Sequence, residues 1–552
     1  MERIKIKFLN NNEAIEFNKG ITYGDLYTYY KNNYNFMPYA FKVNNKLKNW
    51  NEKITKDISV LAIDYHDISG YKVCQVALKF MVNYAVKELY GDDSNVLYLN
   101  SLDKGTYFEI SSRKIIDKEE VSVIKNKLLE IIKENIKFNR VIVEKKDACN
   151  YFNIINEKEK IDNIMAIPGE NVTLYKLGKY YNYFYSPMPF STEAIKLFDL
   201  VYISNNHLVL LYPTPRNNEL NYNHFPKTLN IFEEYRSWLK NMNTMYVADL
   251  NNVVASGDIN DYIACNEMAF NDKLSLVTQK IISDEKNIKF VLIAGPSSSG
   301  KTTTSKRLKL NLKRYGINSY TLSTDDYFKN RVDTPKDENG NYEFEVVEAL
   351  DLDLLKSDLD KLLHGEEINP PVFNFLSGEK EFKNKKFKLN DGEVVIIEGL
   401  HSLNERLTSN IHEENKFKIY VSPFTGLELD RHNHISTVDS RLLRRIIRDN
   451  RTRGYDVSQT INTWQKVRND EEKYIYPYQD NADVIINTAL IYELGVIKVF
   501  AEPLLLSVSV DSIYYEESRR LLGFLRIFYP ISPELVPKES VLREFIGGSK
   551  FE

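Results

Sequence analysis

A glycine-bounded loop, followed by a lysine and two threonines, lies near the middle of the 552-residue chain. The loop and its flank comprise Gly295, Pro296, Ser297, Ser298, Ser299, Gly300, Lys301, Thr302 and Thr303. Glycines let successive backbone N–H groups turn toward an anion, the lysine reaches the β- and γ-phosphates of a nucleotide, and the first threonine hydroxyl binds Mg²⁺. An apolar run at 290–294 precedes the loop and leucines at helical spacing follow it, which is the strand–loop–helix setting of a P-loop. The pattern predicts ATP and Mg²⁺ as cofactors, against the alternative of a chance match in a Gly/Ser loop.

Two acidic groups follow other predicted strands of the same region. Asp325 and Asp326 come directly after 319–323, and Glu398 ends the apolar run 394–398. The carboxyl ends of parallel strands form the ligand-binding edge of an α/β sheet, so these groups are expected to meet the loop. Asp325, preferred over Asp326 as the inward side chain, would accept a proton from an attacking hydroxyl, and Glu398 would hold Mg²⁺. The alternatives are a turn-capping aspartate and a strand-end glutamate in solvent.

Six arginines fall within residues 441–453. On a helix, Arg441, Arg444, Arg445 and Arg448 form one basic stripe, opposite a face of leucine and isoleucine. Guanidinium groups suit bidentate contact with phosphate, so the segment is a candidate lid over ATP. The alternative is a solvated amphipathic helix.

Composition and charge exclude several classes of protein. The chain has 43% hydrophobic and 27% charged residues, and a net charge of −4 gives no general nucleic-acid footprint. Its three cysteines are far apart, which favours a reducing, cytoplasmic compartment over a disulfide framework. The first residues read as neither a signal nor a transit peptide, and no apolar run approaches the roughly 20 residues that span a bilayer.

The first 66 residues alternate apolar and charged positions around one predicted helix that begins at Thr22, where Thr22 as N-cap and Asp25 form an imperfect capping box. This β-grasp-like order resembles the TGS domain of threonyl-tRNA synthetases. Residues 67–250 resemble the editing domain of threonyl- and alanyl-tRNA synthetases, most closely in VTLYKLGKYYNYFYSPMPFST. The positions that match the four metal ligands hold Val76, Phe80, Phe184 and Met188, which cannot bind zinc, so the resemblance implies a shared fold without editing chemistry. His432 and His434 are the nearest pair of histidines, and we expect them to be solvated rather than metal-bound.

The segments GPSSSGKTT, STDDYF, VVIIEG, RLLRRIIRDNRTRG and YPYQDNADVIINTAL resemble the uridine kinase and phosphoribulokinase family in order and spacing. The whole chain resembles long bacterial uridine kinase-like proteins that join synthetase-like modules to this kinase. The resemblance implies that 295–303 binds ATP, with Lys301 on the transferred phosphate and Thr302 on Mg²⁺. It also implies catalytic roles for Asp325, Lys301, Arg444 and Arg448, and substrate contacts for Asp325, Tyr327, Phe373 and Asn374.

The predicted fold class is α/β and multidomain, with a doubly wound parallel sheet in the kinase domain. The expected parts are a TGS-like β-grasp domain (1–66), an α+β editing-like domain (67–250), a helical linker (251–285), the P-loop kinase domain (286–505) and a C-terminal helical extension (506–552).

One segment departs from the family pattern. Short uridine kinases carry Pro-x-Tyr-Asp-Phe followed by a histidine that reads the base, whereas this chain has Phe373, Asn374 and Gly378 at the corresponding positions. A nucleoside acceptor is expected, and because the base-reading residues differ, uridine is the family default and not a choice that this sequence indicates. Two alternatives are kept: another small alcohol or sugar as acceptor, and an ATP-switched protein that binds tRNA or the ribosome. A small-molecule substrate is expected and a membrane partner is not; nucleic acid is disfavoured, tRNA is left open, and so is a homo-oligomer.

Overall fold

A five-stranded sheet carrying one helix forms the first unit of the computed structural model, which describes residues 2–34, 36–102, 104–283, 287–338, 340, 342–374 and 377–552. The strands run in the order β2-β1-β5-β3-β4. Their bounds are β1 (Arg3–Phe8), β2 (Ala14–Asn18), β3 (Ala40–Val43), β4 (Lys46–Leu47) and β5 (Ile58–Ile63). Helix α1 (Tyr23–Asn33) begins with the predicted capping box: the Thr22 hydroxyl accepts from Asp25 N at 3.1 Å, and the Asp25 carboxylate accepts from Thr22 N at 2.8 Å.

The second unit packs a long central helix against two antiparallel sheets, ordered β11-β12-β7-β6 and β10-β9-β8. That helix is α2 (Ile68–Tyr90). The other elements of the second unit are β6 (Asn95–Leu102), β7 (Gly105–Ser111), α3 (Lys118–Glu134), β8 (Asn139–Glu144), α4 (Lys145–Ile154), α5 (Lys158–Ala166), β9 (Asn171–Leu177), β10 (Tyr180–Asn182), β11 (Asp199–Ser204) and β12 (His207–Leu211). Helix α3 ends at Asn135, which caps it in a left-handed conformation with φ of 53°.

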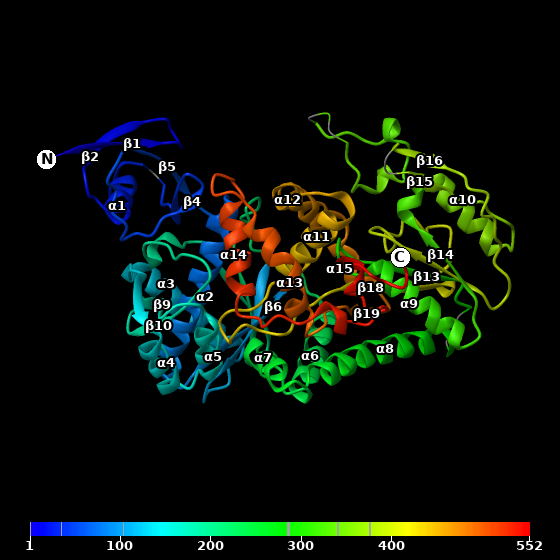
Figure 1. Cartoon of the computed structure of the whole chain (residues 1–552), viewed down its shortest axis with the longest axis horizontal. Helices are drawn as coiled ribbons and strands as arrows, with labels where there is room; N and C mark the ends of the chain where they lie inside the picture. Colours follow the sequence, from blue (N-terminus) through cyan, green and yellow to red (C-terminus); the bar gives the residue numbers. More distant parts are fainter. Residues whose placement is uncertain are drawn as a thin grey trace.

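Three helices lead from the second unit to the parallel sheet: α6 (Pro226–Asn241), α7 (Val247–Ser256) and α8 (Ile259–Ser283). Helix α8 runs along one edge of the molecule (Figure 1) and packs on the helix that follows the P-loop. None of the helices in the described part of the chain combines the length and apolarity needed to cross a membrane.

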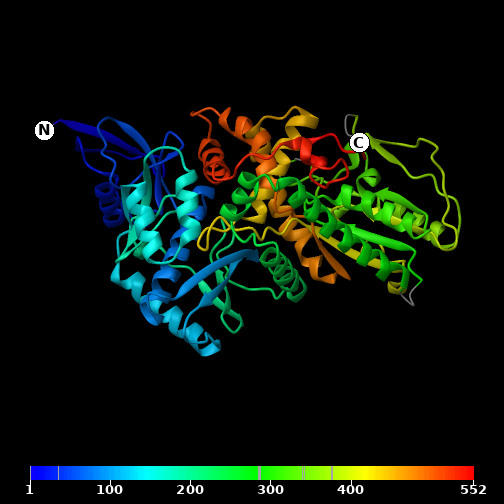
Figure 2. The same ribbon diagram turned by 60° about the horizontal axis from the view of Figure 1, so that its bottom comes forward.

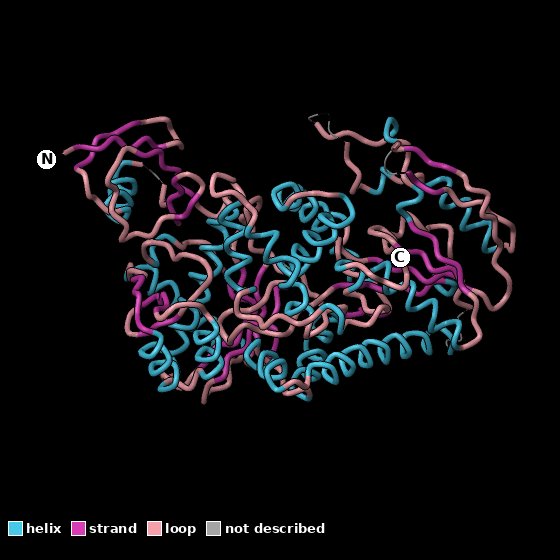
Figure 3. Tube along the Cα trace, in the orientation of Figure 1, coloured by secondary structure: helices cyan, strands magenta, loops and turns pink. Residues whose placement is uncertain are grey.

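A five-stranded sheet, parallel throughout and ordered β14-β17-β13-β18-β19, forms the kinase-like unit (Figure 3). Its strands are β13 (Phe290–Ala294), β14 (Ser319–Ser323), β17 (Val394–Glu398), β18 (Lys416–Ser422) and β19 (Val484–Asn487). Alternate residues of β13 enter different cores: Val291 and Ile293 pack with α8 and with α9 (Lys301–Arg314), while Phe290 and Leu292 pack with α10 (Leu352–Leu363). Helices therefore cover both faces, and the predicted doubly wound α/β architecture is confirmed, with β19 as a strand that the sequence pattern did not reveal.

The helices of this unit are α9 (Lys301–Arg314), α10 (Leu352–Leu363), α11 (Thr437–Arg453), α12 (Val457–Tyr474) and α13 (Glu493–Leu506), with a hairpin of β15 (Val372–Asn374) and β16 (Glu379–Glu381). The last segment adds α14 (Tyr515–Leu525) and α15 (Arg543–Ile546). It lies between the units in both views (Figure 2): α14 contacts β4 and α13, and α15 contacts α11. The last residues of the chain thereby reach the P-loop.

Candidate active site

Strand β13 delivers the predicted loop to the carboxyl edge of the parallel sheet, and α9 begins at Lys301. Ser298 and Gly300 adopt left-handed conformations, with φ of 59° and 86°. A Cβ on Gly295 would lie 2.1 Å from the Val421 carbonyl oxygen, so the close passage of the loop along β18 requires glycine there. Lys301 Nζ donates to the carbonyl oxygens of Gly295 at 2.8 Å and Pro296 at 3.1 Å, and burial lowers the pKa of this lysine.

Two carboxylates from distant parts of the chain occupy donors of the loop. Glu471 of α12 accepts from Ser297 N at 2.7 Å. Glu544 of α15 accepts from Thr303 N at 3.1 Å and from the Thr303 hydroxyl at 2.8 Å. Backbone amides and hydroxyls at a helix N-terminus are donors that suit phosphate, so both glutamates stand where an anion would bind. Sequence reasoning missed them because they lie 174 and 241 residues from their partners and no local pattern marks them.

Asp325 and Glu398 meet at the same edge because Ser323 and Glu398 are register partners on β14 and β17. Glu398 Oε1 accepts from the Thr302 hydroxyl at 3.4 Å. Burial and then the charge of Asp325 raise the pKa of Glu398 to about 7. Burial also raises the pKa of Asp325, although the charge of Lys301 opposes the shift. The structure thus brings Lys301, Thr302, Asp325 and Glu398 together, and the last two with Thr302 offer hard oxygen ligands of the kind Mg²⁺ prefers.

The two neighbouring aspartates have different surroundings. Asp326 Oδ1 accepts a hydrogen bond from Phe373 N at 3.2 Å. Among the residues that the structure describes, none donates a hydrogen bond to the Asp325 carboxylate, whose own backbone N–H is held by the Ser323 hydroxyl at 3.3 Å. This difference supports Asp325 as the carboxylate that remains available to a substrate.

Two of the four arginines in the α11 stripe, Arg441 and Arg444, lie in the interior, which differs from both the solvated helix and the mobile lid considered above. Arg441 and Arg444 are 1% and 0% exposed, because α12, α13 and α15 pack around them. Arg441 Nε donates to the Ser297 carbonyl oxygen at 2.8 Å, and its guanidinium forms an ion pair with Glu471. Through these contacts, Arg441 of α11 and Glu471 of α12 hold the loop in place.

The other three arginines divide between support and the site. Arg444 pairs with Glu493 at 2.6 Å and reaches the Ser298 carbonyl oxygen at 3.4 Å, which makes it a positioning residue of the loop in place of the expected catalytic one. Arg445 Nη1 donates to the Ser297 hydroxyl at 3.0 Å. Arg448 is the member whose charge opposes the rise in the pKa of Asp325, which puts it within electrostatic reach of that carboxylate.

The expected substrate contacts are only partly available. Tyr327 is fully buried and its hydroxyl donates to Asp358 at 2.9 Å, a packing role that differs from the expected substrate contact. Phe373 packs edge-on against Phe328 with ring centroids 5.7 Å apart, and Asn374 Nδ2 donates to Glu381 at 2.7 Å. Strand β15 of the hairpin also contacts the 324–327 turn.

Arg331 and Glu345 are two further polar groups that the sequence did not reveal. A Cβ on Gly378 would lie 2.9 Å from Arg331 Nε, so Arg331 fills the space that a side chain at 378 would need. Burial, reinforced by the charges of Glu471 and Asp325, raises the pKa of Glu345 to about 7.

In the second unit, the four positions that match metal ligands contribute apolar contacts. Phe80 and Phe184 have ring centroids 5.4 Å apart, and Met188 is 1% exposed. The expectation of a solvated His432–His434 pair is wrong: burial by the surrounding units lowers the pKa of both, and their ring nitrogens accept from Lys160 and Lys79 at 2.6 and 2.5 Å.

Comparison with known proteins relates two parts of the chain to different proteins. The model of the Phosphoribulokinase / Uridine kinase family matches residues 290–491. A uridine kinase of Staphylococcus aureus (strain JH9) is 30% identical over 195 residues, which are 35% of this chain and 84% of that protein. The chain therefore belongs to the Phosphoribulokinase / Uridine kinase family.

The N-terminal region matches threonine–tRNA ligases. The ligase of a Wolbachia strain from Drosophila simulans is 30% identical over 166 residues, 30% of this chain and 26% of the ligase, and that of Ehrlichia canis is 26% identical over 249 residues, 43% and 36%. The chain thus spans about a quarter to a third of the length of these ligases. A solved structure described as a possible uridine kinase from Bacillus stearothermophilus covers 27% of this chain and 79% of its own, at 21% identity and a TM-score of 0.22.

Proposed function

We propose that this P-loop kinase transfers the terminal phosphoryl group of ATP to a primary hydroxyl of a small ribose-bearing molecule, with the 5′-hydroxyl of uridine as the default acceptor. The single observation that carries the proposal is the Asp325 carboxylate, available for hydrogen bonding at the same sheet edge as Lys301, Thr302 and Glu398. The identity of a uridine kinase relative that is matched over 84% of its length supports the default.

The chain's own groups divide the work of a direct transfer. Thr302 and Glu398 would hold Mg²⁺, which supplies charge neutralisation at the phosphates when bound, and Lys301 would stabilise charge on the transferred group. Asp325 takes the proton of the acceptor hydroxyl as the new O–P bond forms and the bond from the phosphorus to the bridging oxygen of ADP breaks. The raised pKa of Asp325 makes it a better base than an exposed aspartate, and activity should fall as the pH drops through that raised value.

The test is formation of nucleoside monophosphate from ATP and a panel of nucleosides. Asp325→Asn should lower kcat by about 10²- to 10⁴-fold, the usual contribution of a general base, while binding of a non-hydrolysable ATP analogue persists. Asp326→Asn is the matched control, because the Asp326 carboxylate neighbours Asp325 but accepts a hydrogen bond from Phe373 N. Wild-type turnover in Asp325→Asn would remove the assigned base.

A second candidate keeps the chemistry and changes the acceptor to another sugar or alcohol. Gly378 leaves no side chain to read a base, and Arg331 fills that space, a group suited to an anionic or polyhydroxylated acceptor. Activity on a sugar or polyol with equal inactivity on all nucleosides would decide for this candidate. Arg331→Ala should then raise KM for that acceptor while the KM for ATP stays unchanged.

The match to threonine–tRNA ligases motivates a third candidate, an ATP-switched protein that binds tRNA. Binding through phosphate contacts would weaken steeply with salt. A gel-shift titration of tRNA at two salt concentrations, with and without ATP, separates this role from a metabolic one.

A further inference from the structure

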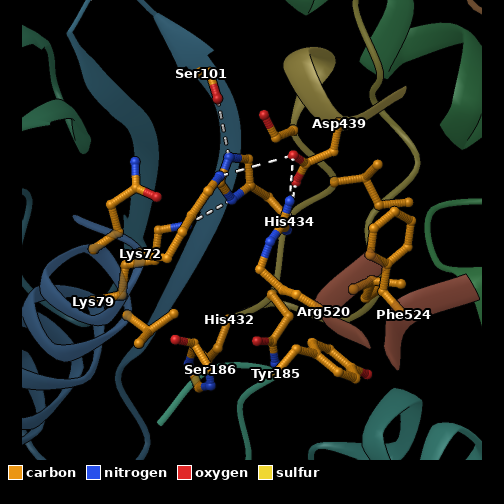
Figure 4. A pocket seen from close by; sticks show the side chains of 16 residues that line it. Lys72, Lys79, Ser101, Tyr185, Ser186, His432, His434, Asp439, Arg520 and Phe524 are labelled. Carbon is orange, nitrogen blue, oxygen red and sulfur yellow. Dashed lines mark hydrogen bonds and ion pairs between the residues drawn. The ribbon is translucent and has the colours of Figure 1, made fainter. Parts of the chain in front are cut away.

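Two adjoining cavities lie where the second unit, the kinase-like sheet and α14 meet. The smaller, about 100 Å³, is lined from α2 by Lys72 and Lys79, from β6 by Ser101, from the 429–436 loop by His434, and from α14 by Arg520 (Figure 4). The larger, about 550 Å³, shares Lys72 and Ser101 with it. That volume is within the usual range for small-molecule sites. The nucleotide loop lies outside both linings.

Lys79 is the unusual group of the smaller cavity. Its side chain is 5% exposed, and Nζ donates to His434 Nδ1 at 2.5 Å and lies 5.1 Å from the centre of the Tyr98 ring. His434 Nε2 in turn lies 3.2 Å from the Ser101 hydroxyl. No carboxylate in the described part of the chain forms an ion pair with Lys79. A buried ammonium with only a neutral imidazole as partner is costly unless an anion joins it.

The nearby carboxyl groups are engaged elsewhere. Asp430 accepts from the Tyr183 hydroxyl at 2.7 Å and from His432 N at 2.8 Å. Glu428 Oε2 accepts from Ile435 N at 3.3 Å, and burial raises the pKa of this carboxyl, although the charge of Lys79 opposes the shift. Asp439 binds both terminal nitrogens of Arg520, at 2.9 and 2.7 Å, and is 3.8 Å from Lys72. Among the described residues, Lys79 therefore has no ion-pair partner and Lys72 has only the long contact with Asp439, so both can take up an added anion.

The balance of charge around both cavities is positive, in a chain whose net charge is −4. Six cations line them against two carboxylates: Lys72, Lys79, Lys104, Arg441, Arg468 and Arg520 against Asp439 and Glu472. Carboxylates just behind the walls neutralise two of the six, since Glu471 pairs with Arg441 and Glu517 pairs with Arg520. With Lys79 protonated, two formal positive charges are left, which match the charge of roughly −2 on a phosphate monoester.

The larger cavity has a different character, because six aromatic side chains line it: Tyr71, Tyr212, Phe225, Tyr420, Phe424 and Tyr476. Tyr71 and Tyr212 form an edge-on pair with centroids 5.9 Å apart. Such walls accept a planar ring through stacking and edge contacts.

We propose that the two cavities form one binding site, separate from the P-loop, for a small phosphate monoester that carries a planar ring. The phosphate group lies beside Lys72 and Lys79, and the ring lies among the aromatic side chains of the larger cavity. Residues from the second unit, α11 and α14 all contribute, so the site exists only in the assembled chain.

The test uses the full chain and three probes: uridine 5′-monophosphate, ribose 5-phosphate and inorganic phosphate. Isothermal titration should show uridine 5′-monophosphate binding that weakens at least tenfold in Lys79→Met. The affinity should persist in Lys176→Met, a control lysine that likewise lies over a tyrosine ring, Tyr181 at 5.3 Å, away from the cavities. The affinity should also persist in Asp325→Asn, because Asp325 belongs to the proposed acceptor site and lines neither cavity.

Loss of binding in Asp325→Asn with full binding in Lys79→Met would overturn the proposal, as would the absence of binding at millimolar probe. Equal affinity for ribose 5-phosphate would overturn the assignment of the ring. If Lys79→Met fails to fold, amine-selective acetylation of the wild-type chain replaces it: the probe should protect Lys79 and leave Lys176 unchanged, and unprotected Lys79 at saturating probe refutes the site.

Discussion

Glu544 should compete with the nucleotide for the first turn of α9. Its carboxylate receives two hydrogen bonds from Thr303, through N at 3.1 Å and the hydroxyl at 2.8 Å. Hydrogen bonds to charged groups contribute about 1.5–3 kcal/mol, and neutral ones about 0.5–1.5 kcal/mol. Glu544→Gln keeps an acceptor but removes the charge, and the side chain is only half-buried, so displacing it should become easier by about 1–2 kcal/mol. That corresponds to roughly a 5- to 30-fold lower Kd for an ATP analogue.

The assay is titration of the full chain with a non-hydrolysable ATP analogue and Mg²⁺. Glu539→Gln is the matched control, because Glu539 belongs to the same segment but pairs with Lys550 at 4.0 Å. The control should leave the Kd unchanged. Weaker binding in Glu544→Gln would refute competition. It would show instead that Glu544, together with Val541 packed beside Gly300, holds the loop in its binding conformation.

Three further predictions concern burial. Arg444→Met leaves the buried Glu493 carboxylate without its ion-pair partner, so it should lower the free energy of unfolding by about 3–5 kcal/mol in urea titrations. Adding Glu493→Gln should restore most of that loss. Equal stability of the single and double variants would contradict the ion pair. Burial lowers the pKa of Lys79 to about 7. Between pH 7 and the ordinary lysine pKa of about 10.4, the unfolded chain holds this proton and the folded chain does not. Lys79→Met should therefore raise Tm most below pH 7 and progressively less toward pH 10, and a constant difference would argue against the shift. The charged and titratable groups that face Lys79 are Lys72, Glu428, Asp430, His434 and Asp439. Gly295→Ala should lower Tm and abolish binding of the ATP analogue, because its Cβ would lie 2.1 Å from the Val421 carbonyl oxygen; unchanged binding would show that the loop can shift.

Local patterns were enough to predict the features that depend on short stretches of chain. The capping box at Thr22, the strand–loop–helix around Gly295 and the all-apolar strand ending at Glu398 were all read correctly, because periodicity, capping and glycine conformation act within a few residues. The meeting of Asp325 with Glu398 also followed, since parallel strands share their carboxyl edge. Strand β19 and helices α4, α5 and α7 were missed, because their short patterns compete poorly with the alternatives until tertiary contacts select them.

Adjacent residues are enough to define the P-loop motif and the class of the fold, because both depend on local spacing and periodicity. The use of the charged groups depends instead on contacts between segments that are far apart in the chain. Packing buries Arg441 and Arg444 next to the loop, places Glu544 on a P-loop amide from 241 residues away, and encloses His434 with Lys79 from 355 residues away. The physical reason is that a charge costs free energy to bury unless a partner meets it, and which partner arrives depends on packing between distant segments.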